Sequence, residues 1–342
     1  MKFTYRTLAV AVAAALVVPT QATFAQDENL TEEVVVIGTR TEGRSALDSP
    51  APVDVIGGET MSNQGDTDMS NLLRNVVPSY NVNDQPISDA ATLVRPANLR
   101  GLAPDHTLML VNGKRRHRAS VITWLGNGIS NGSQGPDAAA IPALALKRIE
   151  VLRDGASAQY GSDAIAGVMN FVLNDAREGG SVEVRYGEYN EGDGEQVTIA
   201  GNIGLPLGDS GFLNLTAEWG ESDPTSRSEQ RADAQGLIDD GYQNVPVPAM
   251  IWGRPIVSDD MKLWANFGVD LSDTLELYGH ANYNSKEVDG GFFFRNPTNR
   301  GAVYSGDGGA TLLIGDLTPD GNGNCPVVAL DGNIPDPVAF AQ

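Results

Sequence analysis

The feature that most constrains the fold of this 342-residue chain is a strict alternation of apolar and polar side chains after residue 180. Alternation with a period of two places all the apolar side chains on one face of an extended strand. The pattern recurs in five segments of roughly ten residues, over residues 181–186, 196–205, 213–219, 262–271 and 275–284. It predicts five consecutive antiparallel strands, each with one apolar and one polar face.

The connections between these segments are short on one side and mostly long on the other. Residues 206–211 and 272–273 are short connections, whereas 190–195, 220–261 and everything after residue 285 lie on the other side. This arrangement is typical of transmembrane β-barrels. A soluble β-sandwich with one solvated face also fits the alternation. Because a bacterial barrel needs at least about 8 strands to close, five strands predict an incomplete barrel and a truncated sequence.

The N-terminus has the order of a secretory signal peptide. Lys2 and Arg6 give a positive start, residues 8–18 form an unbroken apolar run, and residues 23–25 supply small residues for cleavage after Ala25. A short buried helix is the competing interpretation. No later apolar run approaches the roughly 20 residues that a transmembrane helix needs, so any membrane crossing is expected to use strands.

The formal net charge of −21 is distributed unevenly along the chain. Residues 1–174 hold 14 basic and 17 acidic residues, whereas residues 175–342 hold 9 basic and 27 acidic residues. The change coincides with the onset of alternation, which predicts a domain boundary near Asn174. So acidic a chain is not expected to bind nucleic acid. It suits a solvated surface or a lumen that handles cations or neutral polar ligands.

Cysteine and histidine are too scarce for a disulfide scaffold or a histidine-rich metal site. The chain has one cysteine, Cys325, and three scattered histidines. Residues 320–331 resemble the start of a calcium loop, but Cys325 stands where the loop needs glycine and Asp331 replaces the final glutamate. A glycine-rich turn is the alternative. No cofactor and no metal site are expected.

The region before Asn174 has the pattern of a compact α/β unit. An apolar periodicity of helical type predicts a helix over residues 68–77, with Asp66, Thr67 or Asp68 as its N-cap. Short apolar runs predict strands over residues 53–56, 107–111, 149–152 and 166–173. Residues 153–161 are expected to form a turn-rich loop, and Gly167 is expected to mark a close approach of the backbone.

Four segments in this region resemble, in order, those of TonB-dependent outer-membrane receptors. Glu33-Val34-Val35-Val36-Ile37-Gly38-Thr39-Arg40 resembles the TonB box, although these residues could also be the first strand of the domain. The segments 52–56, 95–102 with 111–115, and 149–170 resemble the beginning, middle and C-terminal signature of the plug domain. The resemblance covers about residues 32–174, and the later segment matches by pattern only.

The resemblance implies an α+β plug domain followed by antiparallel transmembrane β-barrel strands. The implied division is 1–25 signal peptide, 26–45 periplasmic tail with the box at 32–40, 46–174 plug domain, and 175–342 the first part of the barrel with its extracellular loops. The implied partners are TonB with its inner-membrane energising complex, outer-membrane lipid and a substrate of the siderophore, cobalamin or oligosaccharide class. The alternative is a secreted or surface β-rich binding protein without transport. No catalytic motif indicates an enzyme.

The resemblance and the pattern together name candidate functional residues. Glu33, Val34, Val35, Val36 and Ile37 are expected to bind TonB by strand addition. Plug arginines are expected to meet carboxylates on the polar faces of the strands, and the residues assigned to this role are Arg100, Arg153, Glu183, Glu218 and Glu276. Polar plug segments beside an aromatic residue suit a polar substrate, and the candidates there are Trp124, Asn127 and Asn131. The basic run 114–118 is expected to be a solvated loop or to meet such carboxylates, and a nucleic-acid patch is the alternative interpretation.

Overall fold

The computed structural model describes residues 52–291 except 67, 83–92, 96, 124–127, 243–244 and 273, together with 34–35, 37, 44–45, 294, 296, 311–313 and 327–329. The expected signal peptide and most of the 320–331 loop lie outside these residues. Within the described part of the chain, no helix is both long and apolar enough to cross a membrane.

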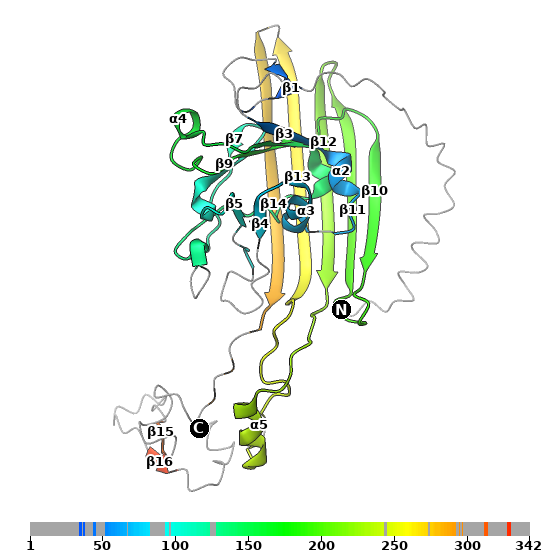
Figure 1. Cartoon of the computed structure of the whole chain (residues 1–342). Helices are drawn as coiled ribbons and strands as arrows, with labels where there is room; N and C mark the ends of the chain where they lie inside the picture. Colours follow the sequence, from blue (N-terminus) through cyan, green and yellow to red (C-terminus); the bar gives the residue numbers. More distant parts are fainter. Residues whose placement is uncertain are drawn as a thin grey trace, which may run out of the picture. The chain divides into compact units, whose positions relative to one another are not determined.

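Residues 53–173 fold into an α/β unit built on a five-stranded sheet (Figure 1). The strands lie in the order β3 (Val53–Gly57), β8 (Leu146–Leu152), β9 (Gly167–Leu173), β6 (Thr107–Val111) and β7 (Lys114–Arg115). β6 and β9 are parallel, and the other neighbours are antiparallel. The four predicted strands are confirmed. The two-residue β7 was missed because it is too short to show any periodicity.

The predicted helix is α3 (Met69–Val76), and Asp68 is its N-cap. The Asp68 carboxylate accepts hydrogen bonds from the backbone N–H groups of Ser70 and Asn71, at 2.9 and 3.2 Å. These bonds satisfy donors that have no partner inside the helix. Met69, Leu72 and Leu73 are buried against the sheet's core cluster, as their helical spacing predicts. Each contributes roughly 1.5–3 kcal/mol of burial.

Gly167 begins β9 where the backbone passes close to its neighbours. A Cβ atom at this position would collide with the Leu152 carbonyl oxygen and would lie 2.8 Å from the Leu99 side chain. Its φ of 156° also lies outside the usual range of other residues. The predicted close approach is therefore confirmed.

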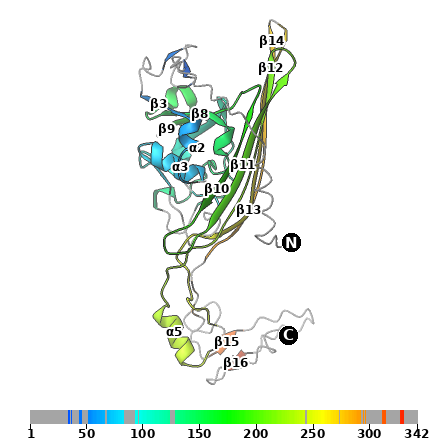
Figure 2. The ribbon, with the colours of Figure 1, turned by 90° about the vertical axis from the view of Figure 1, so that its right-hand side faces the viewer.

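The alternating segments form one antiparallel sheet, called the wall sheet below. Its strands follow the chain order, β10 (Gly180–Gly187), β11 (Gln196–Leu207), β12 (Gly211–Ser222), β13 (Ile256–Ser272) and β14 (Leu275–Asp289). Every predicted strand falls inside one of them. Figure 2 shows the α/β unit lying against one face of this sheet.

The remaining described elements are short. One turn of helix, α4 (Ser157–Tyr160), lies in the segment expected to be a loop, because four residues are too few for a helical pattern. The others are β1 (Val34–Val35), β2 (Arg44–Ser45), α2 (Gly58–Ser62), β4 (Tyr80–Val82), β5 (Ala97–Leu99), α5 (Ala232–Asp239), β15 (Thr311–Leu313), β16 (Val327–Ala329) and the 3-10 helices Pro104–His106, Gly128–Ser130 and Ala143–Ala145.

Candidate functional site

The wall sheet buries its polar side chains and exposes its apolar ones, which is the reverse of a sheet in a soluble protein. On β12 the side chains of Asn214 and Thr216 are 3% and 4% exposed, whereas Leu215 between them is 37% exposed. The same order holds on β13, where Lys262 is buried and Leu263 is 41% exposed. A β-sandwich would bury its apolar face in the core between its sheets. Exposed apolar and buried polar faces are the arrangement of a transmembrane barrel strand.

The buried polar face makes hydrogen bonds to the α/β unit. Asn112, in the turn after β6, donates from Nδ2 to Asn266 Oδ1 at 3.0 Å. Asn266 in turn donates to the Asn174 carbonyl oxygen at 3.0 Å. The Trp264 indole donates to the Ala140 carbonyl oxygen, also at 3.0 Å. Amide and indole groups of β13 therefore hold the α/β unit by its backbone and turns.

Part of the basic run 114–118 also faces the wall sheet. Lys114 lies 5.4 Å from the centre of the Tyr278 ring, and the Arg116 guanidinium lies 5.2 Å from the Trp264 ring. Both distances are those of cation–π contacts. Burial lowers the pKa of Arg116 below its ordinary value. The expectation of a wholly solvated loop is therefore wrong, because alternate residues of the run point at the sheet.

Arg185 on β10 forms hydrogen bonds to the α/β unit beside helices α2 and α3. Its guanidinium donates to the carbonyl oxygens of Ser62, the last residue of α2, and of Asp66, just before α3. Glu183, two residues away on the same strand face, pairs with the guanidinium. Strand periodicity brings residues i and i+2 to one face, so Glu183 orients Arg185. We call this arrangement the Arg185 clasp.

The predicted arginines of the unit have their contacts inside the unit. Arg100 lies 3.7 Å from Asp154 and donates to the Ala166 carbonyl oxygen at 3.4 Å. Arg153 donates to Asp54 at 2.9 Å. The structure therefore does not bring these arginines to the wall carboxylates.

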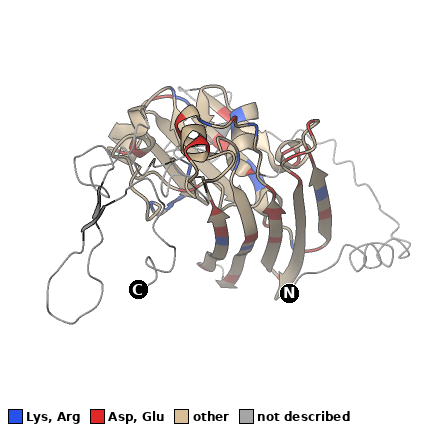
Figure 3. Cartoon of the chain, turned by 90° about the horizontal axis from the view of Figure 1, so that it is seen from below, with Lys and Arg blue, Asp and Glu red and all other residues tan. Residues whose placement is uncertain are grey.

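The predicted wall glutamates have partners of their own. Glu218 accepts a bond of 2.6 Å from Lys262, which stands opposite it in the register of β12 and β13. Glu183 pairs with Arg185, and Glu276 is exposed on β14. Glu218, which is buried, and Glu183, which is partly buried, thus each pair with a cation of the wall sheet instead of a plug arginine. Figure 3 shows such acidic residues interspersed with basic ones on the strands.

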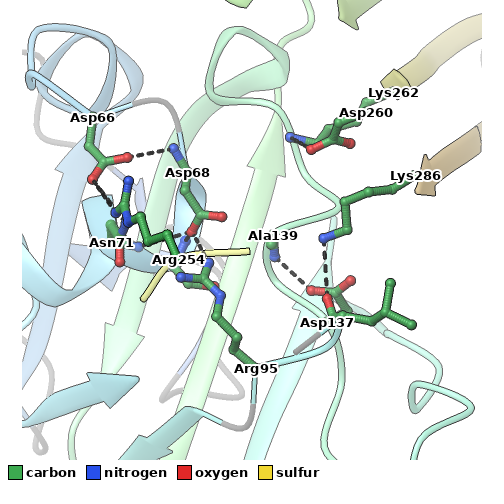
Figure 4. A network of polar contacts seen from close by, with 12 residues as sticks. Asp66, Asp68, Asn71, Arg95, Asp137, Ala139, Arg254, Asp260, Lys262 and Lys286 are labelled. Atoms are coloured by element: carbon green, nitrogen blue, oxygen red, sulfur yellow. Dashed lines mark hydrogen bonds and ion pairs between the residues drawn. The ribbon is translucent and has the colours of Figure 1, made fainter. Parts of the chain in front are cut away.

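Charged groups of the α/β unit and of the wall segment meet beside α3 (Figure 4), where Arg254, just before β13, lies 4.0 Å from Asp66, just before the helix. Asp68, the α3 cap, forms an ion pair with Arg95. Lys262 donates to Glu218 and lies 3.6 Å from Asp260. The Lys262 and Glu218 side chains are buried, whereas the Asp68 side chain is 32% exposed. Burial raises the pKa of Asp68, but the neighbouring Arg95 outweighs this effect, so the pKa lies well below its usual range.

The candidate TonB-binding residues are described only in part. Val34 and Val35 form β1, and Glu33 and Val36 lie outside the described residues. Ile37 is 1% exposed. It belongs to a buried apolar cluster with Leu108, Leu110, Leu152, Ala164 and Val168. The end of the segment is therefore packed into the α/β unit.

The candidate substrate-facing residues are described only at Asn131. This residue is exposed, and its backbone N–H donates to the Gly128 carbonyl oxygen at 3.1 Å. Trp124 and Asn127 lie outside the described residues. Among the residues that are described, no three His, Cys, Asp or Glu side chains gather as a metal site.

Comparison with known proteins identifies the α/β unit. Residues 45–168 match the family model described as the TonB-dependent receptor plug domain. This segment is a plug domain. Plug and wall sheet together resemble a crystal structure of the ferric enterobactin receptor of Pseudomonas aeruginosa, with a TM-score of 0.53 and 22% identity over 68% of this chain and 33% of that one. This likeness concerns the fold.

Curated relatives extend the match from the plug domain into the wall sheet. The vitamin B12 transporter of Photobacterium profundum is 29% identical over 75% of this chain and 38% of its own length. The ferrienterobactin receptor of Escherichia coli is 26% identical over 78% of this chain and 33% of its own length. The chain thus spans about a third of the length of the curated relatives that it matches.

Proposed function

We propose that the chain forms part of a TonB-dependent receptor in the outer membrane of a Gram-negative bacterium, which takes a scarce or large substrate into the periplasm. The observation that carries the proposal is the inverted wall sheet, with apolar side chains outside and the plug domain on its polar face. Such a sheet suits lipid on one side and a filled lumen on the other. Several of the matched relatives are named as receptors or transporters, and those names support a siderophore or cobalamin class of substrate. An oligosaccharide is the third class proposed.

The division of the chain is part of this proposal. A signal peptide would occupy 1–25, a periplasmic tail 26–45, the plug domain 46–174, and barrel strands with extracellular loops 175–342. The end of β9 at Leu173 and the beginning of β10 at Gly180 support the boundary near Asn174.

Residues 33–37 are the proposed contact with TonB. A β-prone segment ahead of the plug sheet can pair by strand addition through its backbone. Because the Ile37 side chain is buried in the plug domain, the partner would first meet residues 33–36. The backbone there would matter more than most side chains.

Separate measurements of binding and uptake test the proposal in cells that carry the complete receptor. Val35→Pro removes an N–H donor and fixes φ, so it should abolish uptake but leave binding at the cell surface intact. Val35→Ala should be mild. Equal loss of binding and uptake in the proline variant would make the segment a structural strand instead. Uptake that continues in cells without TonB would remove the energy-coupling role, and binding without any uptake would favour a surface β-rich binding protein.

A further inference from the structure

A polar cleft lies between the plug domain and the ends of wall strands β11–β14 that carry the long connections. It has a cavity volume of about 110 Å³ and opens to solvent at its mouth. Its lining includes Asp68, Asn71 and Arg95 of the plug domain and Gln196, Glu218, Glu221, Ser222, Arg254, Asp260, Lys262 and Lys286 of the barrel segment. Figure 4 shows part of this lining.

The charges of the cleft are balanced. Four cations and four carboxylates line it. Arg95 pairs with Asp68, Lys262 pairs with Glu218 at 2.6 Å, and Arg254 lies 4.0 Å from Asp66. A site for a multiply charged anion would present an excess of cations. This cleft presents none.

The connections beside the cleft are acidic. Residues 188–195 and 223–255 together hold nine acidic and three basic side chains. Their field would raise the energy of an approaching polyanion, such as a ferric tris-catecholate. An uncharged ligand would not experience this barrier.

One buried acceptor in the cleft has no donor among the described residues. Asn71 is 1% exposed, and its Oδ1 has no hydrogen-bond partner there, whereas its Nδ2 donates to Asp66 at 2.9 Å. A buried acceptor left unpaired costs free energy, and Asn71 is one of several amide and carboxylate residues lining the cleft, whose side chains suit a ligand that donates hydrogen bonds. Metal-bound catecholate oxygens only accept, whereas a sugar hydroxyl both donates and accepts.

We propose that this cleft binds an uncharged, hydroxyl-rich ligand of the neutral oligosaccharide class. The inference rests on the proposed receptor function and narrows its substrate. Sugar hydroxyls match a lining that mixes amides, hydroxyls, carboxylates and cations. Apolar side chains among the lining residues are few, namely Pro255, Val257 and Val288, so the cleft offers little surface to the face of a corrin ring.

Binding to outer-membrane vesicles that carry the complete receptor tests the inference. The probes are neutral cello-, malto-, xylo- and manno-oligosaccharides, cyanocobalamin and ferric enterobactin. We expect at least one neutral oligosaccharide to bind with an affinity independent of salt concentration. Gln196→Met removes a polar group from the cleft and should weaken that binding about tenfold. The matched control Gln235→Met, at an exposed position of helix α5, should change it less than twofold.

Two outcomes overturn the inference. One is the absence of binding by every neutral oligosaccharide, whichever other probe binds. The other is an oligosaccharide affinity that both glutamine variants change equally. TonB-dependent uptake of ferric enterobactin alone would refute the oligosaccharide class and leave the receptor function standing. Oligosaccharide binding without TonB-dependent uptake would refute the receptor function and leave the oligosaccharide class standing.

Discussion

The Arg185 clasp gives the sharpest prediction about how the plug domain is held. Arg185→Met keeps most of the side-chain volume and removes the guanidinium that bonds the Ser62 and Asp66 carbonyl oxygens. It also leaves Glu183 without its partner. Hydrogen bonds from charged donors contribute roughly 1.5–3 kcal/mol each. Because the side chain is 17% exposed and water can replace part of the loss, we expect the local attachment to weaken by about 2–4 kcal/mol.

Amide hydrogen exchange in the complete receptor measures this loss. A change of about 1.4 kcal/mol alters an opening equilibrium tenfold. Exchange of the amides in residues 58–70 should therefore rise by about 30-fold to several hundred-fold, under conditions in which reclosing is faster than chemical exchange and the exchange rate follows the opening equilibrium. Amides of β8 and β9 should not change, because the plug core does not depend on the clasp. Arg185→Lys should recover part of the protection, since it keeps the charge but not the forked geometry.

Arg177 supplies the matched control. Its guanidinium also donates to two backbone carbonyl oxygens, those of Gly208 and Asp209, but these belong to the turn between β11 and β12. Arg177→Met should therefore leave residues 58–70 protected. Unchanged exchange in Arg185→Met, or an equal rise in both variants, would refute the clasp.

Three further predictions concern the buried charges and the plug backbone. Lys262→Met leaves the Glu218 carboxylate buried and unpaired and should destabilise the receptor by about 3–5 kcal/mol, whereas adding Glu218→Gln should restore much of the loss, as thermal unfolding of the purified receptor can measure. The pKa of Asp68 is lowered beside Arg95, so the stability from this pair is complete above pH ~4, the unfolded value, and is lost only as pH falls further. The difference in unfolding midpoint between Asp68→Asn and the unsubstituted receptor should therefore be the same at pH 7 and at pH 5. A difference that changes between these pH values would refute the assignment. Gly167→Ala forces a Cβ into the neighbouring strand β8, so pulse proteolysis should show a strongly lowered level of folded plug domain. In the control Gly65→Ala, the added Cβ meets nothing within 4 Å, and the level of folded plug domain should hardly change.

The sheet of the barrel segment was predictable because its signal is local. On β13 the residues Leu263, Ala265, Phe267, Val269 and Leu271 fall on one face whatever the strand pairs with, so period-two alternation fixes the faces. Trp264, on the other face, breaks the alternation. The helix α3 was predictable for the same reason, since Asp68 and the apolar spacing after it lie within ten residues. Elements of two to four residues, such as β7 and α4, carry too few side chains for any period.

The pairing of charges was not predictable to the same extent. Glu218 meets Lys262 only through the register of β12 and β13, and the long segment between the strands hides that register in the sequence. Glu183 and Arg185 are different, because their i,i+2 spacing on a predicted strand was a usable signal for a same-face pair. The prediction instead paired plug arginines with wall glutamates by charge alone. It overlooked the nearer cations.

The plug domain and the wall sheet are joined by a different kind of contact from the one that holds the plug together. The plug core is apolar and includes fully buried Ile149, Met169 and Phe171, so opening it costs roughly 1.5–3 kcal/mol for each such side chain. The contacts to the wall are mostly hydrogen bonds and ion pairs, which water can replace at a net cost of about 0.5–1.5 kcal/mol per neutral bond. Trp264 is different, because it is the one described wall residue that belongs to the apolar core cluster of the plug domain. A pull on the plug should therefore break its wall contacts before its core, and Trp264 should resist that separation most.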